Sequence, residues 1–346
     1  MSRKFRILSI DGGGLRGIIP LQFIKEIEDI TGQPIHKTFD LIAGTSTGGL
    51  LTSALTLQDN NSIEADTRRY TLEEIEKIYL NKGKLIFPPK KWFSRKKSKL
   101  TKLFNPEFNA KNFNDILINY FANERISNCL RPIFITSYNV HRNIPIFFTS
   151  RDALTSLDKN VKLIEVCRAT SAAPTYFPTY EFNYNTENLM CIDGGVIMNN
   201  PSLGALVEVL GNKDYKFYKL EDKILSLEDI CVLSLGTGYC SNLMNVNKMK
   251  NWGTLSWIRP IIDISLEGAS KIAHKQISTI FKASGAEKNY LRLDIDIERK
   301  YSEMSDAREE TLNYLKNETI SQINTNHTLV NSLKTFLVNS GLDLEK

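Results

Sequence analysis

The sequence lacks several features that would place it in a specialised class of protein. No apolar run approaches the roughly 18 residues that a membrane-spanning helix requires, since stretches such as 50–57 are short and broken by Thr and Ser. The five cysteines are widely spaced without a C-x-x-C pair, which argues against a disulfide framework and against a zinc cluster. No internal repeat is present. With 346 residues, 42% of them hydrophobic, we expect one globular domain with no cofactor and no metal.

A signal peptide is also missing from the start of the sequence. Residues 1–4 lead directly into a strand-like run at 5–10, which leaves no room for the apolar region and cleavage site of a leader. We therefore expect a cytoplasmic protein. Peripheral contact with a membrane and secretion as an effector both remain open.

Acidic residues are absent from one segment. Residues 82–102 contain nine Lys or Arg, which leaves the rest of the chain net acidic although the whole carries +5. Aromatic residues interleaved with lysines suit an anionic membrane surface, where each basic residue contributes roughly 1 kcal/mol. A solvated loop is an equal alternative, and nucleic acid is not expected. The residues predicted to contact a membrane are Lys90, Lys91, Trp92, Phe93, Arg95, Lys96 and Lys97.

Short apolar runs alternate with helical patterns, which predicts an α/β fold with a largely parallel central sheet. A convincing helix with Pro20 in its first turn and Gly32 at its end separates the first two strands. The pattern predicts a core at 1–240 with a polar, basic insertion at about 59–114, and a helical C-terminal extension at 241–346 packed on the same domain. The expected strands are 5–10, 39–43, 132–138, 144–148, 189–192, 230–235 and 290–295.

The first strand runs into a glycine-rich turn, DGGGLRG at 11–17. Its glycines match the G-x-G-x-x-G dinucleotide fingerprint, so a Rossmann site is one alternative. That site needs an acid at the end of the second strand to hold the ribose. The strand at 39–43 ends instead in another glycine turn, which disfavours nucleotide binding.

The second turn, GTSTG at 44–48, has the G-x-S-x-G pattern of a nucleophile elbow. Gly44 and Gly48 permit the sharp turn, and the helix that follows favours negative charge at Ser46. The first glycine turn is expected beside it at a neighbouring strand end. Its free N–H groups would receive an oxyanion there, with Arg16 adding positive charge.

A serine nucleophile needs a base, and histidine is scarce. The four histidines, at 36, 141, 274 and 327, each lie in a context typical of surface or packing residues. An α/β-hydrolase is disfavoured because only two strands precede the elbow. The third turn, DGG at 193–195, ends an apolar strand, and NNP at 199–201 opens a helix after it, which places Asp193 on a loop with fixed ends. We expect its carboxylate beside Ser46 across neighbouring strand tips.

Together these turns resemble the patatin-like phospholipase family. DGGGLRG at 11–17 is similar to the family's oxyanion loop, GTSTG at 44–48 to its elbow and DGG at 193–195 to its D-G-A/G motif. Further matches, all in family order, are ATSAAPTYF at 169–177, NNP at 199–201 and LSLGTG at 233–238. The resemblance implies a three-layer α/β/α fold with a mostly parallel sheet and a helical C-terminal part.

The resemblance also implies a Ser-Asp dyad without histidine. Ser46 would be the nucleophile, Asp193 its base, and Gly12, Gly13 and Gly14 the oxyanion hole, helped by Arg16. The implied activity is that of a lipid acyl hydrolase of phospholipase A or lysophospholipase type, acting on membrane phospholipid through an acyl-enzyme. An acyltransferase with the same dyad and a non-catalytic lipid-binding or storage protein remain alternatives. Headgroup, chain length and oligomeric state are not predicted.

This chemistry makes a demand on Asp193. An aspartate with its usual pKa of about 3.9 is a poor base near neutral pH. Burial or a neighbouring acid should therefore raise the pKa of Asp193, or the proton of Ser46 must be made easier to lose.

Overall fold

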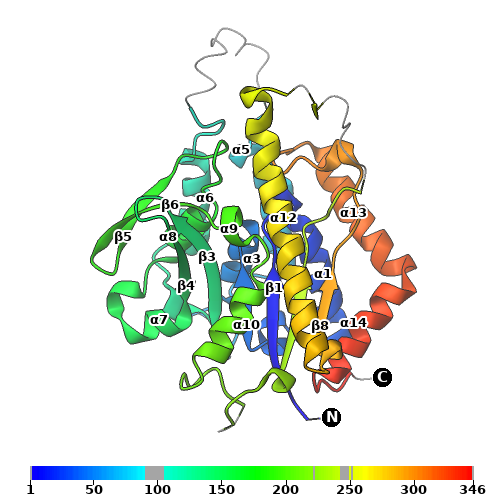
Figure 1. The fold of residues 1–346 in the computed structure, drawn as a ribbon. Coiled ribbons are helices and arrows are strands. Elements are labelled where there is room, and N and C mark those ends of the chain that lie inside the picture. The colour runs from blue at the N-terminus through cyan, green and yellow to red at the C-terminus, as the bar shows by residue number, and fades with distance from the viewer. Residues whose placement is uncertain (1, 90–104, 221–222, 242–248, 251, 345–346) are drawn as a thin grey trace.

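The computed structural model of the chain describes residues 2–89, 105–220, 223–241, 249–250 and 252–344. Eight strands of these residues form one sheet with the order β5-β6-β3-β2-β1-β7-β8, in which β4 pairs with β3 beside this path (Figure 1). The strands are β1 (Phe5–Ile10), β2 (Leu41–Gly44), β3 (Ile133–Asn139), β4 (Ile144–Thr149), β5 (Tyr180–Tyr184), β6 (Glu187–Asp193), β7 (Ile230–Leu235) and β8 (Tyr290–Leu293).

The sheet is mixed, and its parallel part carries the centre. Strands β3, β2, β1, β7 and β8 run parallel to their neighbours in that order. Strands β4, β5 and β6 are joined by antiparallel pairs at one side. This confirms the predicted α/β class with a mostly parallel sheet.

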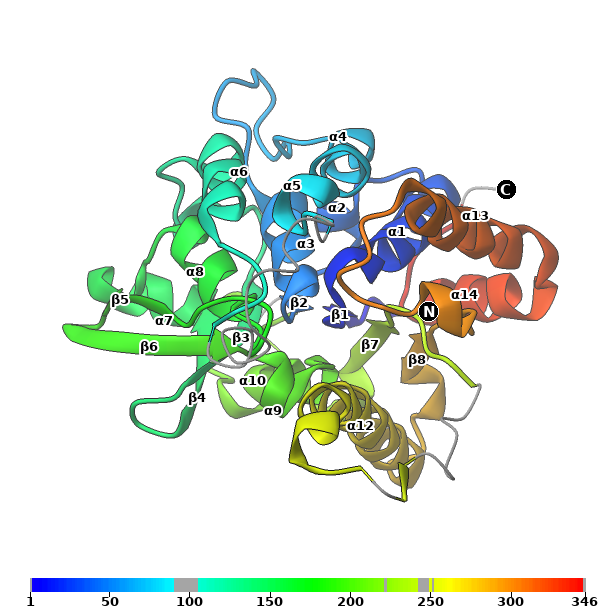
Figure 2. The same ribbon diagram turned by 90° about the horizontal axis from the view of Figure 1, so that it is seen from above.

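Helices cover both faces of the sheet and so make three layers (Figure 2). Because every residue of β1 is buried, each face of this strand meets a helical layer. One face packs against α1 (Ile18–Thr31), α2 (Ile35–Thr38), α3 (Thr47–Thr56), α6 (Lys111–Phe121), α8 (Leu163–Thr170), α13 (Glu309–Thr325) and α14 (His327–Asn339). The other face packs against α9 (Gly195–Met198), α10 (Ser202–Gly211) and α12 (Thr254–Ala283).

Most predicted elements are present, with shifted ends. Helix α1 ends at Gly32, which takes a left-handed φ of 63° as its C-cap. The predicted insertion contains α4 (Leu72–Lys77), followed by a π-helical turn at Ile78–Lys82 and α5 (Gly83–Ile86). Strand β5 and the short helix α7 (Ser150–Thr155) were not predicted.

The C-terminal residues share the sheet with the rest of the chain. Strand β8 pairs in parallel with β7, and α12 packs on α9 and α10. The division into a core at 1–240 and an extension at 241–346 stays a prediction. Within the described residues, no helix has both the length and the apolar composition needed to cross a bilayer.

Candidate active site

Ser46 occupies a sharp turn between β2 and α3. Its φ of 53° and ψ of −121° are strained for a residue with a side chain, a geometry that holds the hydroxyl away from both elements. The two flanking glycines make the turn possible. A Cβ at Gly44 would lie 2.2 Å from the Gly48 carbonyl oxygen, and one at Gly48 would lie 2.1 Å from the carbonyl oxygen of Ile10 on the adjacent β1. The local geometry is therefore that of a nucleophile elbow.

Asp193 ends β6 and is 3% exposed. The N–H of Gly195 donates to its Oδ1 at 2.7 Å, which fixes the carboxylate. Burial raises the pKa of Asp193 to about 6, and hydrogen bonding from the Ser46 hydroxyl and the Gly195 N–H opposes that rise. A pKa raised by burial is one of the alternatives that the sequence left open.

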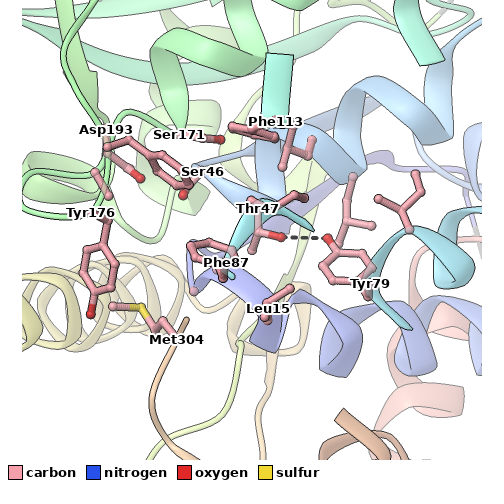
Figure 3. Close-up of a pocket in the computed structure, with 18 of the residues that line it drawn as sticks. Leu15, Ser46, Thr47, Tyr79, Phe87, Phe113, Ser171, Tyr176, Asp193 and Met304 are labelled. Atoms are coloured by element: carbon pink, nitrogen blue, oxygen red, sulfur yellow. Dashed lines mark hydrogen bonds between the residues drawn. The ribbon is translucent and has the colours of Figure 1, made fainter. Parts of the chain in front are cut away.

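Ser46 and Asp193 line the same cavity, where Figure 3 shows them at one side of it. They do not come from neighbouring strands, as the sequence predicted, because β3 lies between β2 and β6. The last residue of α8 and the segment that follows it bridge this gap. The Ser46 N–H donates to Thr170 Oγ1 at 2.8 Å, and the Asp193 N–H donates to the Ala172 carbonyl oxygen at 3.0 Å.

The bridging role of Thr170 and Ala172 was missed from the sequence. Both lie in the ATSAAPTYF motif at 169–177, which carried the resemblance without a role for either residue. The available signal was a threonine at the end of an amphipathic helix in that motif. Nothing local to 169–177 indicates that its partners lie on β2 and β6.

The glycine loop of residues 12–14 lies beside the elbow, as predicted from the strand order. Gly14 has a left-handed φ of 58°. Gly13 and Gly14 line the cavity with Ser46, and within the described part of the chain neither N–H has an acceptor. Gly12 differs, because its N–H donates to the Asn199 carbonyl oxygen at 3.1 Å. The expectation that Gly12 offers a free N–H is therefore wrong.

Arg16 lies elsewhere. It lines a second, more polar cavity of about 540 Å³, and not the cavity of Ser46. Burial lowers the pKa of Arg16, although the carboxylates of Asp294, Asp263 and Glu267 oppose this. Its buried Nε has no partner among the described residues. The expectation that Arg16 adds charge beside Ser46 is not supported by this placement.

The cavity of Ser46 is mostly apolar away from Ser46 and Asp193. Much of its wall comes from the predicted insertion, where α4, the π-helical turn and α5 contribute Ile75, Ile78, Tyr79 and Ile86 (Figure 3). Further apolar lining residues are Leu15, Leu50, Leu51, Ala54, Phe87, Phe113, Ile116, Leu117, Phe121, Phe177, Ile262, Leu266 and Met304. Such a wall suits a hydrocarbon chain.

No histidine is among the described residues that line this cavity. His36 is buried with Nε2 3.0 Å from the Asp66 carbonyl oxygen, and His274 Nδ1 lies 2.9 Å from the Tyr290 hydroxyl. His141 and His327 are exposed. Across the described ranges, no cluster of three or more His, Cys, Asp or Glu has the arrangement of a metal site.

The predicted membrane-contact residues lie outside the described residues. These are Lys90, Lys91, Trp92, Phe93, Arg95, Lys96 and Lys97. Their contact with a membrane stays a prediction from composition.

The fold and this site define a class, an α/β protein with an elbow serine and a buried carboxylate on one apolar cavity. The chain belongs to the patatin-like phospholipase family, whose model matches residues 8–206. It is 34% identical to patatin-like protein 3 of Arabidopsis thaliana over 84% of this chain and 73% of that protein. It is 30% identical to "Probable inactive patatin-3-Kuras 1" of Solanum tuberosum over 83% of this chain and 77% of that protein.

A solved structure is also similar, more distantly. VipD of Legionella pneumophila matches over 92% of this chain and 67% of its own, with 13% identity and a TM-score of 0.35.

Proposed function

We propose that this protein is a lipid acyl hydrolase of phospholipase A or lysophospholipase type, with Ser46 as nucleophile and Asp193 as its base. One observation carries the proposal: Ser46 and the buried Asp193 meet on one apolar cavity that no histidine lines among the described residues. A carboxylate with a pKa of about 6 is a usable base at neutral pH.

In the first half of the reaction, Ser46 Oγ attacks the ester carbonyl carbon while its proton passes to Asp193. The oxyanion that forms accepts hydrogen bonds from the N–H groups of Gly13 and Gly14. The C–O bond to the alcohol then breaks, and the departing oxygen takes the proton from Asp193. The acyl chain stays in the apolar cavity as an ester of Ser46.

In the second half, water attacks the acyl-enzyme and gives its proton to Asp193. The tetrahedral intermediate collapses, Ser46 Oγ recovers that proton, and the fatty acid leaves. If an alcohol replaces water in this step, the product is a new ester, which is the acyltransferase alternative. The dyad serves both reactions, so only product analysis separates them.

The test is release of fatty acid from a mixed phospholipid extract, measured by mass spectrometry. We expect free fatty acid and lysolipid from the wild type and neither from Ser46→Ala. Acyl transfer to added lysolipid or alcohol in place of fatty acid would favour the acyltransferase. Equal, background-level release by both proteins, on phospholipids and on p-nitrophenyl esters, would support a binding protein instead, a reading for which the name of the potato relative gives precedent.

We also propose, from sequence alone, that the basic segment 82–102 brings the enzyme to anionic membranes. Vesicle sedimentation with and without anionic lipid checks this. A variant with Lys90, Lys91, Lys96 and Lys97 replaced by Gln should bind anionic vesicles more weakly than the wild type. Equal binding by the two proteins would remove the proposal.

A further inference from the structure

Asp11 is a buried carboxylate that the proposed mechanism does not use. It follows β1 directly, precedes the glycine loop and is 2% exposed. Arg292 of β8 donates two hydrogen bonds to this carboxylate, from Nη2 to Oδ2 at 2.8 Å and from Nη1 to Oδ1 at 3.3 Å. A paired contact of this kind fixes the orientation of a carboxylate as well as balancing its charge.

The same guanidinium ties three strand ends together. Arg292 Nη1 donates to Ser234 Oγ on β7, and Nη2 donates to Asp294 Oδ2 just beyond β8, both at 2.8 Å. The other oxygen of Asp294 accepts the Gly238 N–H at 2.8 Å. The residue before it, Thr237, donates its hydroxyl to the carbonyl oxygen of the first loop glycine at 2.8 Å. The network therefore holds the start of the glycine loop from two directions.

The far end of the loop is held by the same part of the chain. The Leu15 N–H donates to the Met304 carbonyl oxygen at 2.9 Å. A Cβ at Gly14 would lie 2.5 Å from that oxygen, so the two backbones are in close contact. Both Arg292 and Met304 lie beyond residues 8–206, where the family model matches.

We infer that Arg292 is a positioning residue for the proposed hydrolysis, holding Asp11 so that the Gly13 and Gly14 N–H groups stay beside Ser46. This inference rests on the proposed function. Arg292 does not line the cavity of Ser46, so it acts through the loop and not on the substrate. It also assigns a task to the C-terminal residues, which complete the site from 281 positions away in sequence.

The test is Arg292→Met, assayed on a p-nitrophenyl ester and compared per folded molecule. A displacement of the loop by about 1 Å should lower kcat by about 100-fold. KM should stay near the wild-type value because the apolar cavity is untouched. Arg292→Lys keeps the charge but loses the paired contact, so its kcat should lie between the two.

A double-mutant cycle with Asp11→Asn separates positioning from general damage. If Arg292 acts through Asp11, the double variant should be about as slow as either single variant. Losses that multiply would overturn the inference. If Arg292→Met does not fold, Arg292→Lys carries the test, and wild-type kcat in that variant would overturn the inference equally.

Arg6→Met is the matched control. Arg6 is 5% exposed, lies on β1 and has its Nε 3.9 Å from Asp40 Oδ2. Its loss should lower Tm and leave kcat per folded molecule unchanged. If Arg292→Met behaves like Arg6→Met while Ser46→Ala is inactive, the positioning role fails and the proposed function stands. If Ser46→Ala keeps wild-type activity, the proposed function itself fails.

Discussion

Two buried aspartates, Asp11 and Asp193, line different cavities, and burial raises the pKa of each to about 6. Their surroundings differ. Asp11 lines the polar cavity and is bound by Arg292, whereas Asp193 lines the apolar cavity, and no basic side chain among the described residues pairs with it. The two carboxylates are therefore similarly buried, but among the described residues Asp11 has a basic partner and Asp193 has none.

The difference separates a fixed carboxylate from a reactive one. Asp11 forms an ion pair with Arg292. Neighbouring acids raise the pKa of Arg292 and keep this partner cationic. Among the described residues, the donors to Asp193 are neutral: the Gly195 N–H and the Ser46 hydroxyl. A base must release and regain a proton during each turnover, and a permanent cation beside it would oppose that.

Replacing the unpaired aspartate should have the largest effect. Asp193→Asn should lower kcat for p-nitrophenyl ester hydrolysis by about 10⁴-fold or more, comparable to the loss of one member of a catalytic triad. Ser46→Ala should match it. Replacing each of the four histidines by Ala should leave most of the activity, and a folded histidine variant as inactive as Ser46→Ala would refute the dyad.

The second largest effect on kcat is expected from a change in the glycine loop. Gly13→Ala should lower kcat by about 10²- to 10³-fold, the effect of losing one oxyanion donor, because the new Cβ would lie 2.3 Å from Thr237 Oγ1 and push the loop away. Gly268→Ala is the control, since a Cβ there meets nothing within 4 Å. That variant should keep full activity. Wild-type kcat in Gly13→Ala would rule out this loop as the oxyanion hole.

Asp193→Asn and Arg292→Met should change the free energy of unfolding in opposite directions. In the folded protein the pKa of Asp193 is about 6, above its unfolded value of 3.8, so the stability of its neutral form is present below about pH 4 and lost as pH rises through 6. Asp193→Asn avoids that loss and should gain up to about 3 kcal/mol at pH 8. Arg292→Met leaves a buried carboxylate unpaired and should lose about 3 kcal/mol. Urea unfolding at pH 5 and 8 measures both. Destabilisation by Asp193→Asn at pH 8 would contradict the contrast.

The smallest effect is on the pH profile. Asp193 acts as a base only when ionised, so kcat/KM should fall tenfold per unit below about pH 6 and level off above it. Asp11→Asn should lower the whole profile without moving its midpoint. A midpoint that shifts in Asp11→Asn would mean that the pH profile does not report the ionisation of Asp193 alone.

Local patterns predicted much of this molecule because they depend on near neighbours in sequence. The mostly apolar run at 5–10 is the central strand β1, buried on both faces. The G-x-S-x-G pattern marks the turn at Ser46, where the backbone leaves no room for a Cβ at 44 or 48. Strand β5, a five-residue strand at the edge of the sheet, was not predicted although its residues alternate between aromatic and polar side chains. The part that the insertion plays in the cavity wall was not predicted, because its apolar residues come together with Ser46 only after folding.

The sequence by itself determined the α/β class, the elbow serine, the aspartate turn and the shortage of histidine, since each follows from residue type and short spacing. Only the tertiary structure decided which loop glycines keep free N–H groups and which cavity Arg16 lines. It alone also brought Arg292 to Asp11. Those outcomes depend on hydrogen bonds between residues up to 281 positions apart, and no local pattern encodes which distant partner satisfies a buried group.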